Sequence, residues 1–401
     1  MSDKIFSLEG KGLKLDTADD ITPHLAPLLT NDAVEEVRIA GNTLGVGACA
    51  ALGNALSTKE HLRHAAFADI FTSRLREEIP DALHALLPPL LNCKNLHTID
   101  LSDNAFGKLC EQPLIDFLSK HTPLRHLLLN NNGLGPSAGA NIAGALDELA
   151  TRKKEAGAPE LETIICGRNR LENGSMEAWA KMVSSHGKIK TIKMVQNGIR
   201  QEGIEDFIRN GLVNCPELEI LDLQDNTFTH QGASALADVL PTWKVLRELG
   251  VGDCLLSARG GRAVARALAK GQNKGLKTIR LQYNDLTLPS VERLSKTIKE
   301  GHLPELEKLE LNGNKFSEDD EVVVLLRELL GDDGLDSLSD LEELDSDDEE
   351  EEEEELSEDE GREDVVKKAQ QDENADVAPE KDKAVDDLAD KLAETSVSDK
   401  K

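Results

Sequence analysis

The stretch LEILDLQDNTF, from Leu218 to Phe228, contains the pattern that decides the fold. Leu218, Leu221 and Leu223 are spaced as the inward-facing residues of a short strand, and Phe228 returns to the same interior. Asn226 follows the strand, where its side-chain amide can bond backbone groups that have no ladder partner. The stretch therefore predicts a short buried strand that ends in a turn held by an asparagine.

The same pattern, LxxLxLxxNxL, recurs along most of the chain. Clear matches begin at nine positions, which are Val34, Leu96, Leu124, Leu161, Ile189, Leu218, Leu246, Leu276 and Leu306. Most successive starts are 28 to 30 residues apart, which leaves room for a full α-helix after each strand. Units of this length are typical of leucine-rich repeats of the ribonuclease-inhibitor-like class. We therefore predict an α/β horseshoe solenoid with parallel inner strands and outer helices.

An asparagine fills the position after the strand in most repeats, and a cysteine replaces it once. The asparagines are Asn42, Asn104, Asn132, Asn169, Asn197, Asn226, Asn284 and Asn314, and the cysteine is Cys254. The segment from Ile5 to Leu15 has Leu13 at this position, as suits a terminal cap. At the other end, Ser317 to Leu330 is expected to be a capping helix. We therefore place the repeat domain at residues 1–330.

Two repeats carry insertions. In the unit that starts at Leu62, the extra length falls between strand and helix, in FTSRLREEIPD from Phe71 to Asp81. Arg74 and Arg76 are expected to project from this loop, which is either a functional insertion or a spacer with solvated arginines. The second insertion, around Thr151 to Pro159, is rich in lysine and is predicted to be a surface extension.

Most of the negative charge lies near the C-terminus. The formal net charge is −30, and residues 331–401 hold 31 Asp and Glu against 8 Lys and Arg. Such a segment cannot bury enough apolar surface to offset its ordering entropy, so we predict a largely disordered acidic tail over residues 331–401. Within it, LDSLSDLEEL, from Leu335 to Leu344, could dock as an amphipathic helix or serve as an export signal. The remaining body is mildly acidic, which argues against nucleic-acid binding.

Several classes of site are missing from the sequence. The six cysteines are scattered within apolar patterns and form no CxxC pair, so we interpret them as reduced core residues. No run approaches the roughly 18 apolar residues that a membrane span needs, and the N-terminus lacks the apolar region of a leader. These features predict a cytosolic or nuclear protein. The absence of a P-loop, HExxH, GxSxG or Cys/His cluster argues against an enzyme with its own active site, metal or cofactor.

The residues just before the ladder asparagines should lie along one rim of the horseshoe. In chain order they are Gly41, Asp69, Asp103, Asn131, Arg168, Gln196, Asp225, Asp253, Tyr283 and Gly313. Any one of them can simply be solvated, but a polar row with a spacing of about 4.7 to 4.9 Å could match an extended protein surface. Arg168 and Arg170 flank Asn169 and add donors suited to carboxylate or phosphate. The row therefore predicts a protein-binding edge.

Several strings resemble one family closely. LSDNAFG, NNGLGP, ICGRNRLENGSM and LDLQDNTFTH, together with the acidic tail, are similar to the Ran GTPase-activating proteins, particularly the fungal form. The resemblance runs from about Lys4 to Leu344. It implies that the chain binds the small GTPase Ran in its GTP state, alone or with a Ran-binding protein. It also implies a cytoplasmic monomer that stimulates GTP hydrolysis and so discharges nuclear transport complexes, with GTP and Mg²⁺ carried by Ran.

The same resemblance assigns individual residues. Arg74, in TSRLREEIP, matches the family's essential arginine, and Asn131, in LNNNGLGP, matches the asparagine that abuts Ran's catalytic glutamine. Expected contacts with Ran at matching loop or rim positions are Arg76, Arg168, Arg170 and Asp225. An arginine finger, worth up to roughly 10⁵-fold in rate, is one assignment for Arg74. In the family, however, this arginine is understood to act through the interface, which leaves Asn131 to orient the glutamine.

Two other hypotheses stay open on the sequence alone. Leucine-rich repeats followed by an acidic run also describe acidic nuclear phosphoproteins that bind histones or regulate phosphatases, although those repeats are generally shorter and fewer. A scaffold similar to ribonuclease inhibitor is the third hypothesis, and the low cysteine content counts against it.

Overall fold

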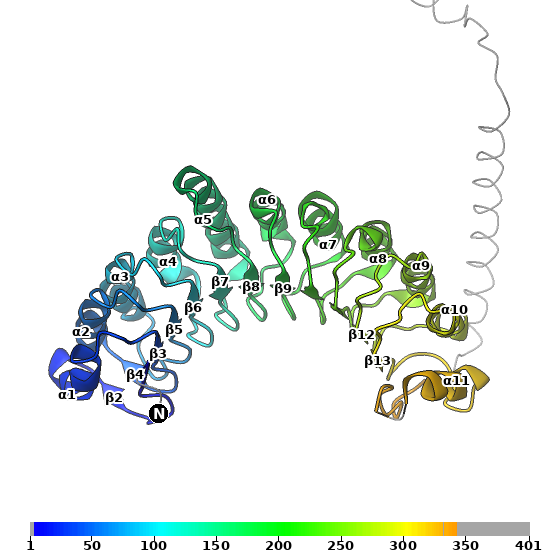
Figure 1. Cartoon of the computed structure of the whole chain (residues 1–401), viewed down its shortest axis with the longest axis horizontal. Coiled ribbons are helices and arrows are strands. Elements are labelled where there is room, and N and C mark those ends of the chain that lie inside the picture. Colours follow the sequence, from blue (N-terminus) through cyan, green and yellow to red (C-terminus); the bar gives the residue numbers. More distant parts are fainter. Residues whose placement is uncertain (1–3, 332, 343–401) are drawn as a thin grey trace, which may run out of the picture. The chain divides into compact units, whose positions relative to one another are not determined.

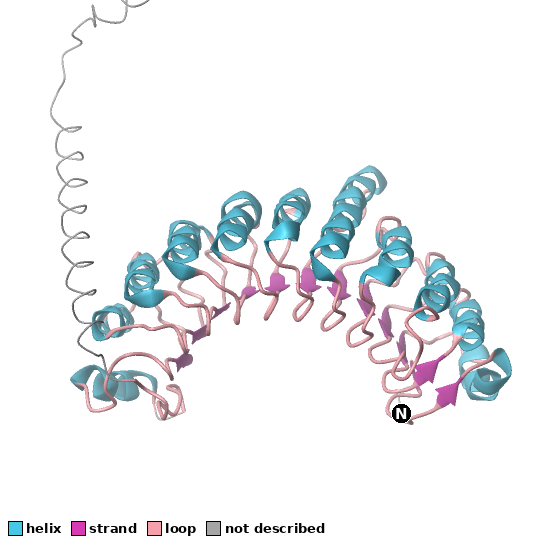
Figure 2. Ribbon diagram, turned by 180° about the vertical axis from the view of Figure 1, so that it is seen from behind, coloured by secondary structure: helices cyan, strands magenta, loops and turns pink. Residues whose placement is uncertain are grey.

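A computed structural model describes residues 4–331 and 333–342 of the chain. The repeats stack into an arc (Figure 1) with strands along the concave side and helices along the convex side (Figure 2). The strands form one parallel sheet in chain order. They are β1 (Ile5–Ser7), β3 (Glu36–Arg38), β5 (His64–Ala66), β6 (Thr98–Asp100), β7 (His126–Leu128), β8 (Thr163–Ile165), β9 (Thr191–Lys193), β10 (Ile220–Asp222), β11 (Glu248–Gly250), β12 (Thr278–Arg280) and β13 (Lys308–Glu310). The predicted horseshoe is confirmed.

The helices return the chain along the outer wall. They are α1 (Ala18–Leu29), α2 (Val46–Leu56), α3 (Ile79–Leu90), α4 (Glu111–Leu118), α5 (Gly135–Ala156), α6 (Met176–His186), α7 (Gln201–Asp206), α8 (Thr229–Val239), α9 (Ser257–Ala269), α10 (Leu288–Lys299) and α11 (Glu321–Leu330). A second, two-stranded parallel sheet of β2 (Lys14–Leu15) and β4 (Thr43–Leu44) ties the first repeat to the second.

The core is a continuous column of leucines and other apolar residues. In the repeat of β10, Leu218, Leu221, Leu223 and Phe228 are fully buried, as the spacing predicts. Leu221 lies in register with the central residues of the strands on either side, so each repeat buries its apolar face against its neighbours. All six cysteines are buried and unpaired, which confirms them as core residues.

The ladder asparagines join consecutive repeats. The side-chain oxygen of Asn169 accepts the backbone N–H of Asn132 at 3.1 Å, and its amide donates to the carbonyls of Leu129 and Gly167 at 2.8 and 2.9 Å. Most of these side chains satisfy buried backbone groups in two repeats at once, whereas Asn197 bonds Cys166 and Asn169 of the preceding repeat. At the exceptional position, the Cys254 thiol donates to the Gly252 carbonyl at 3.3 Å.

A second polar seam runs along the turns from helix to strand. Three residues before the start of a repeat, a buried side chain with a polar atom bonds a backbone carbonyl. The carbonyl belongs to the preceding repeat, except at His121, whose acceptor Leu96 lies in the same repeat. These side chains are Lys59, Cys93, His121, His186, Cys215, Trp243 and Asn273. The periodicity of the leucines did not reveal this seam, because its members share a location but not a side-chain type.

Two predictions about insertions and boundaries are corrected in part. The lysine-rich insertion extends α5 and is mostly exposed, as predicted, but Lys153 within it is fully buried, with its ammonium donating to the carbonyls of Thr122 and Pro159, each at 2.7 Å. The packed body also continues past residue 330, because Leu335 and Leu338 are buried beside β13 without forming a helix. The rest of the predicted acidic tail, residues 343–401, lies outside the described residues.

Candidate functional site

The predicted rim row is a row of left-handed residues. All ten positions have positive φ, between 49° at Asp69 and 73° at Gly41. Each strand leaves the sheet through a tight turn, and Gly, Asn and Asp adopt this conformation most readily. Arg168 and Gln196, both at φ 55°, and Tyr283 at φ 54° adopt this conformation although their residue types disfavour it. At these three positions the turn does not account for the residue type.

Three consecutive asparagines after β7 point in three directions. Asn130 lies on the concave side, and its side-chain oxygen accepts the backbone N–H of Gly167 at 2.7 Å. Asn132 is the buried ladder residue. Asn131 lies between them on the rim and is exposed, with its amide donating to the Asp103 carboxylate at 2.8 Å. Asn131 is therefore the most exposed of the three, with Asn130 half-buried and Asn132 buried.

A cationic groove lies at this part of the rim. It has a volume of about 450 Å³, and its lining includes Asn131, Arg76, Arg168, Arg170 and Lys108. The structure thus brings together four of the six residues predicted for the site, although they come from three different repeats. Four positive side chains around one groove suit a surface that carries carboxylate or phosphate groups.

The floor and edge of this groove contain apolar residues that the sequence analysis missed. Phe106 lines the groove while remaining buried, and its ring lies 6.3 Å from that of Phe71 at the start of the enlarged loop. Leu109 lines the groove with 58% of its surface exposed, and Leu75 on the loop is 71% exposed. Leu75 and Leu109 stand among apolar residues that belong to the core. The sequence could have indicated their exposure only through their position after the turn that follows the strand.

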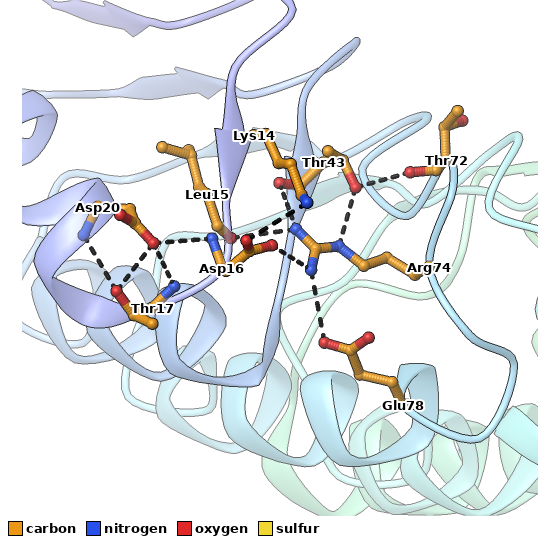
Figure 3. A network of polar contacts seen from close by, with 9 residues as sticks. All are labelled: Lys14, Leu15, Asp16, Thr17, Asp20, Thr43, Thr72, Arg74 and Glu78. Atoms are coloured by element: carbon orange, nitrogen blue, oxygen red, sulfur yellow. Dashed lines mark hydrogen bonds and ion pairs between the residues drawn. The ribbon is translucent and has the colours of Figure 1, made fainter.

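Arg74 is not part of the groove, and the expectation that it projects from its loop was wrong. Its side chain is only 8% exposed and turns back toward the N-terminal repeats (Figure 3). The guanidinium contacts the carboxylates of Asp16 at 2.6 Å and Glu78 at 3.6 Å. It also donates to the hydroxyl and the carbonyl of Thr43 at 2.9 and 3.0 Å. Arg76, by contrast, projects as predicted.

Asp225 lies on the rim two repeats beyond Arg168, away from the cationic groove. Partial burial raises the pKa of its carboxyl group, and the nearby carboxylate of Asp253 raises it further, whereas a hydrogen bond from Gln196 opposes the shift. The rim therefore changes from cationic at Arg168 to acidic at Asp225 and Asp253. A partner that contacts both parts would need to carry charges of both signs.

Residues 4–331 and 333–342 contain no group of three or more His, Cys, Asp or Glu side chains that could hold a metal ion. Within the same ranges, no helix is long and apolar enough to cross a membrane. Burial raises the pKa of every cysteine thiol, to about 12 for Cys166, so these thiols are poor nucleophiles.

Comparison with known proteins assigns the family. A family described as "Leucine Rich repeat" matches residues 214–237. Ran GTPase-activating protein 1 of Saccharomyces cerevisiae is 43% identical over 337 residues, which cover 82% of this chain and 83% of the yeast protein. This chain belongs to the Ran GTPase-activating protein family. Ran GTPase-activating protein 1 of Xenopus laevis is 37% identical over 203 residues, or 50% of this chain and 35% of the frog protein.

Membership of the Ran GTPase-activating protein family favours one of the three hypotheses drawn from the sequence. Ribonuclease inhibitor of Sus scrofa is also similar, at 26% identity over 210 residues that cover 52% of this chain and 43% of the pig protein. That similarity agrees with the predicted class of repeat. The yeast relative is more similar and covers more of the chain, so the family assignment follows it.

Proposed function

We propose that this chain is a GTPase-activating protein for Ran, which binds Ran in its GTP state and stimulates hydrolysis of the bound GTP. The observation that carries the proposal is 43% identity to a yeast protein of that name over most of both chains. The cationic groove beside Asn131 supports it, because the groove contains three of the four residues that the family resemblance marks as contacts.

Asn131 is the residue that we assign to the chemical step. Hydrolysis of GTP by a small GTPase needs an in-line water, an oriented glutamine and compensation of the charge that develops on the transferring phosphoryl group. Asn131 is exposed on a turn whose flanking residues are both fixed by hydrogen bonds to neighbouring repeats. A side chain held in this way can orient Ran's glutamine and exclude bulk water, so that the in-line water remains.

The arginines and Asp225 are assigned to recognition. Arg76, Arg168 and Arg170 would contact acidic groups of Ran at the groove, and Asp225 would contact basic groups farther along the rim. Arg74 is engaged by the chain's own carboxylates. This engagement supports a role for Arg74 through its loop rather than as a finger in the nucleotide site.

Ran would supply the nucleotide and Mg²⁺, so that the chain acts as an activator without an active site of its own. We further propose that it acts as a cytoplasmic monomer and discharges nuclear transport complexes, alone or with a Ran-binding protein.

Single-turnover phosphate release from GTP-loaded Ran, measured with catalytic amounts of this chain, tests the proposal. We expect acceleration of up to roughly 10⁵-fold over intrinsic hydrolysis, as for other activators of small GTPases. The same assay with another GTP-loaded small GTPase is the control for specificity. No acceleration with Ran would overturn the proposal.

A further inference from the structure

Arg74 ties the enlarged loop to the first two repeats. Its Nη1 lies 2.6 Å from Oδ1 of Asp16, its Nε donates to the hydroxyl of Thr43 at 2.9 Å, and its Nη2 donates to the carbonyls of Thr43 and Leu15 at 3.0 and 3.4 Å (Figure 3). These acceptors belong to both strands of the small β2–β4 sheet and to the residue that follows β2. The guanidinium therefore bonds residues that lie between 31 and 59 positions before Arg74 in the chain.

Asp16 is itself held in place from two sides. Its backbone N–H donates to the carboxylate of Asp20 at 3.1 Å, beside the capping box in which Thr17 and Asp20 begin α1. Its second carboxylate oxygen, Oδ2, lies 3.6 Å from the ammonium of Lys14. The backbone of Asp16 is thus tied to the N-terminus of α1, while its carboxylate contacts both Lys14 and Arg74.

The position of the guanidinium needs a negative partner. It lies next to Gly45, the N-cap of α2, where a Cβ atom would come within 3.2 Å of Nη1 and 2.5 Å of the Asp16 carbonyl oxygen. The N-terminus of a helix is electrostatically positive, so a buried cation there is unfavourable by itself. Asp16, together with Glu78 at the start of α3, offsets this cost.

The same contacts fix the loop on both sides of Ser73. The Thr43 hydroxyl, which accepts from Arg74, donates to the carbonyl of Thr72 at 2.7 Å. Ser73 between them holds a left-handed conformation at φ 67°. Immediately after Arg74 come the exposed Leu75 and Arg76. Anchoring at residues 72 and 74 therefore determines where these two side chains are presented.

We infer that Asp16 and Thr43 are positioning residues that act through Arg74 to hold residues 72–78 in a conformation ready for the partner. The inference rests on the proposed function, because the partner that Leu75 and Arg76 would meet is Ran. In this arrangement Arg74 stays inside the chain as an anchor, and Arg76 provides the exposed charge at the groove.

The opposite arrangement makes the opposite prediction. If Arg74 left its pocket to act as a finger at the nucleotide, Asp16 would restrain it, and neutralising Asp16 would maintain or increase the stimulation of hydrolysis. If Arg74 is an anchor, the same change loosens the loop and lowers the stimulation. The sign of one measurement therefore separates the two roles.

The test compares Asp16→Asn and Thr43→Val with Asp32→Asn. Asp32 is the matched control, because its exposed carboxylate also pairs with a buried base, Lys59 at 3.1 Å, but contacts no part of the loop. We expect kcat/KM with GTP-loaded Ran to fall about tenfold for the first two variants and to stay unchanged for the third. Adding Asp16→Asn to Arg74→Ala should cause no further loss, because each change removes the same contact between Asp16 and Arg74.

Hydrogen–deuterium exchange gives a readout that does not depend on Ran. We expect the amides of residues 72–78 to exchange at least about fivefold faster in Asp16→Asn and Thr43→Val, with the rest of the chain unaffected. Unchanged exchange, or stimulation maintained or increased in Asp16→Asn, would overturn the inference. If the wild-type chain failed to activate Ran while the loop still loosened in the variants, the proposed function would fail and the anchor would stand.

Discussion

The side-chain amide of Asn131 donates a 2.8 Å hydrogen bond to the carboxylate of Asp103, one repeat earlier on the same rim. Because the nitrogen is directed to Asp103, the side-chain oxygen of Asn131 is turned away and can accept a hydrogen bond from a partner. Asp103 therefore determines that the oxygen of the Asn131 amide, and not its nitrogen, would face Ran. Asp103 itself need not contact the reacting groups.

Asn131→Ala should mainly impair the chemical step. We expect kcat for hydrolysis of Ran-bound GTP to fall about 100-fold, the effect of misplacing a group that orients the reaction, with little change in KM. Asp103→Ala should cost less, about 3- to 10-fold, because the amide keeps its donor and acceptor but loses its fixed direction. Steady-state kinetics measure both, and circular dichroism checks the fold. A change confined to KM in Asn131→Ala would contradict this division of roles.

Arg168→Ala and Arg170→Ala should slow association with Ran more than they slow chemistry. At low salt each should raise KM by about 3- to 10-fold, and the difference from wild type should shrink as salt increases, since screening weakens exposed charges. Arg152→Ala is the matched control, because Arg152 is an exposed arginine paired with Glu148 on α5. KM at two salt concentrations provides the test, and a loss that is independent of salt would argue against an electrostatic role.

The sequence predicted which rim residues lie side by side better than it predicted the orientation of Arg74, and the reason is physical. In a solenoid, equivalent positions of successive repeats fall in line, so the adjacency of Asn131 and Arg168 follows from spacing alone. The contacts of Arg74 are not periodic, because Thr43 and Leu15 lie 31 and 59 residues earlier and belong to a small sheet that occurs at the N-terminal end. The burial of Lys153 was likewise missed, because its acceptors are backbone carbonyls that no side-chain pattern reports.

Asn169→Ala should destabilise the repeat domain. The substitution removes the acceptor of the Asn132 N–H and the donor to the carbonyls of Leu129 and Gly167, all in the buried ladder. Leaving buried backbone groups unpaired costs about 1–3 kcal/mol each, so a loss of roughly 3 kcal/mol in the free energy of unfolding is expected. Urea unfolding measures it, with the exposed Asn141→Ala on α5 as control. Equal midpoints for the two variants would show that the ladder contributes little.

Two buried histidines should make the domain sensitive to acid. Burial lowers the pKa of His121 and of His186 to about 4, while their imidazoles bond the carbonyls of Leu96 and Leu146. The unfolded chain takes up these protons near its ordinary pKa of about 6.5, whereas the folded chain does not. Stability should therefore be complete above pH 6.5 and fall as the pH drops towards 4, by up to about 3 kcal/mol for each histidine.

Asparagine is the natural replacement for these histidines, because Asn273 already occupies the same position in a later repeat and bonds the Leu240 carbonyl at 2.8 Å. The double variant His121→Asn, His186→Asn should show a flatter dependence of unfolding free energy on pH between 6.5 and 4. Urea unfolding at several pH values measures this dependence. An acid sensitivity as steep as that of the wild type would assign the effect to carboxylates instead.

Two truncations should separate the C-terminal cap from the acidic segment. The Asp336 carboxylate accepts the backbone N–H groups of Leu311 and Asn312, each at 2.9 Å, and so closes the edge next to β13, while Leu335 and Leu338 cover the last repeat. A chain that ends at Leu330 loses these contacts and should be less stable by roughly 3–5 kcal/mol.

A chain that ends at Leu344 keeps them and should retain both its unfolding midpoint and its stimulation of Ran at physiological salt. Equal midpoints for the two truncations would show that residues 331–344 do not act as a cap. If the chain that ends at Leu344 stimulated hydrolysis much less than the full chain, residues 345–401 would contribute to the activity.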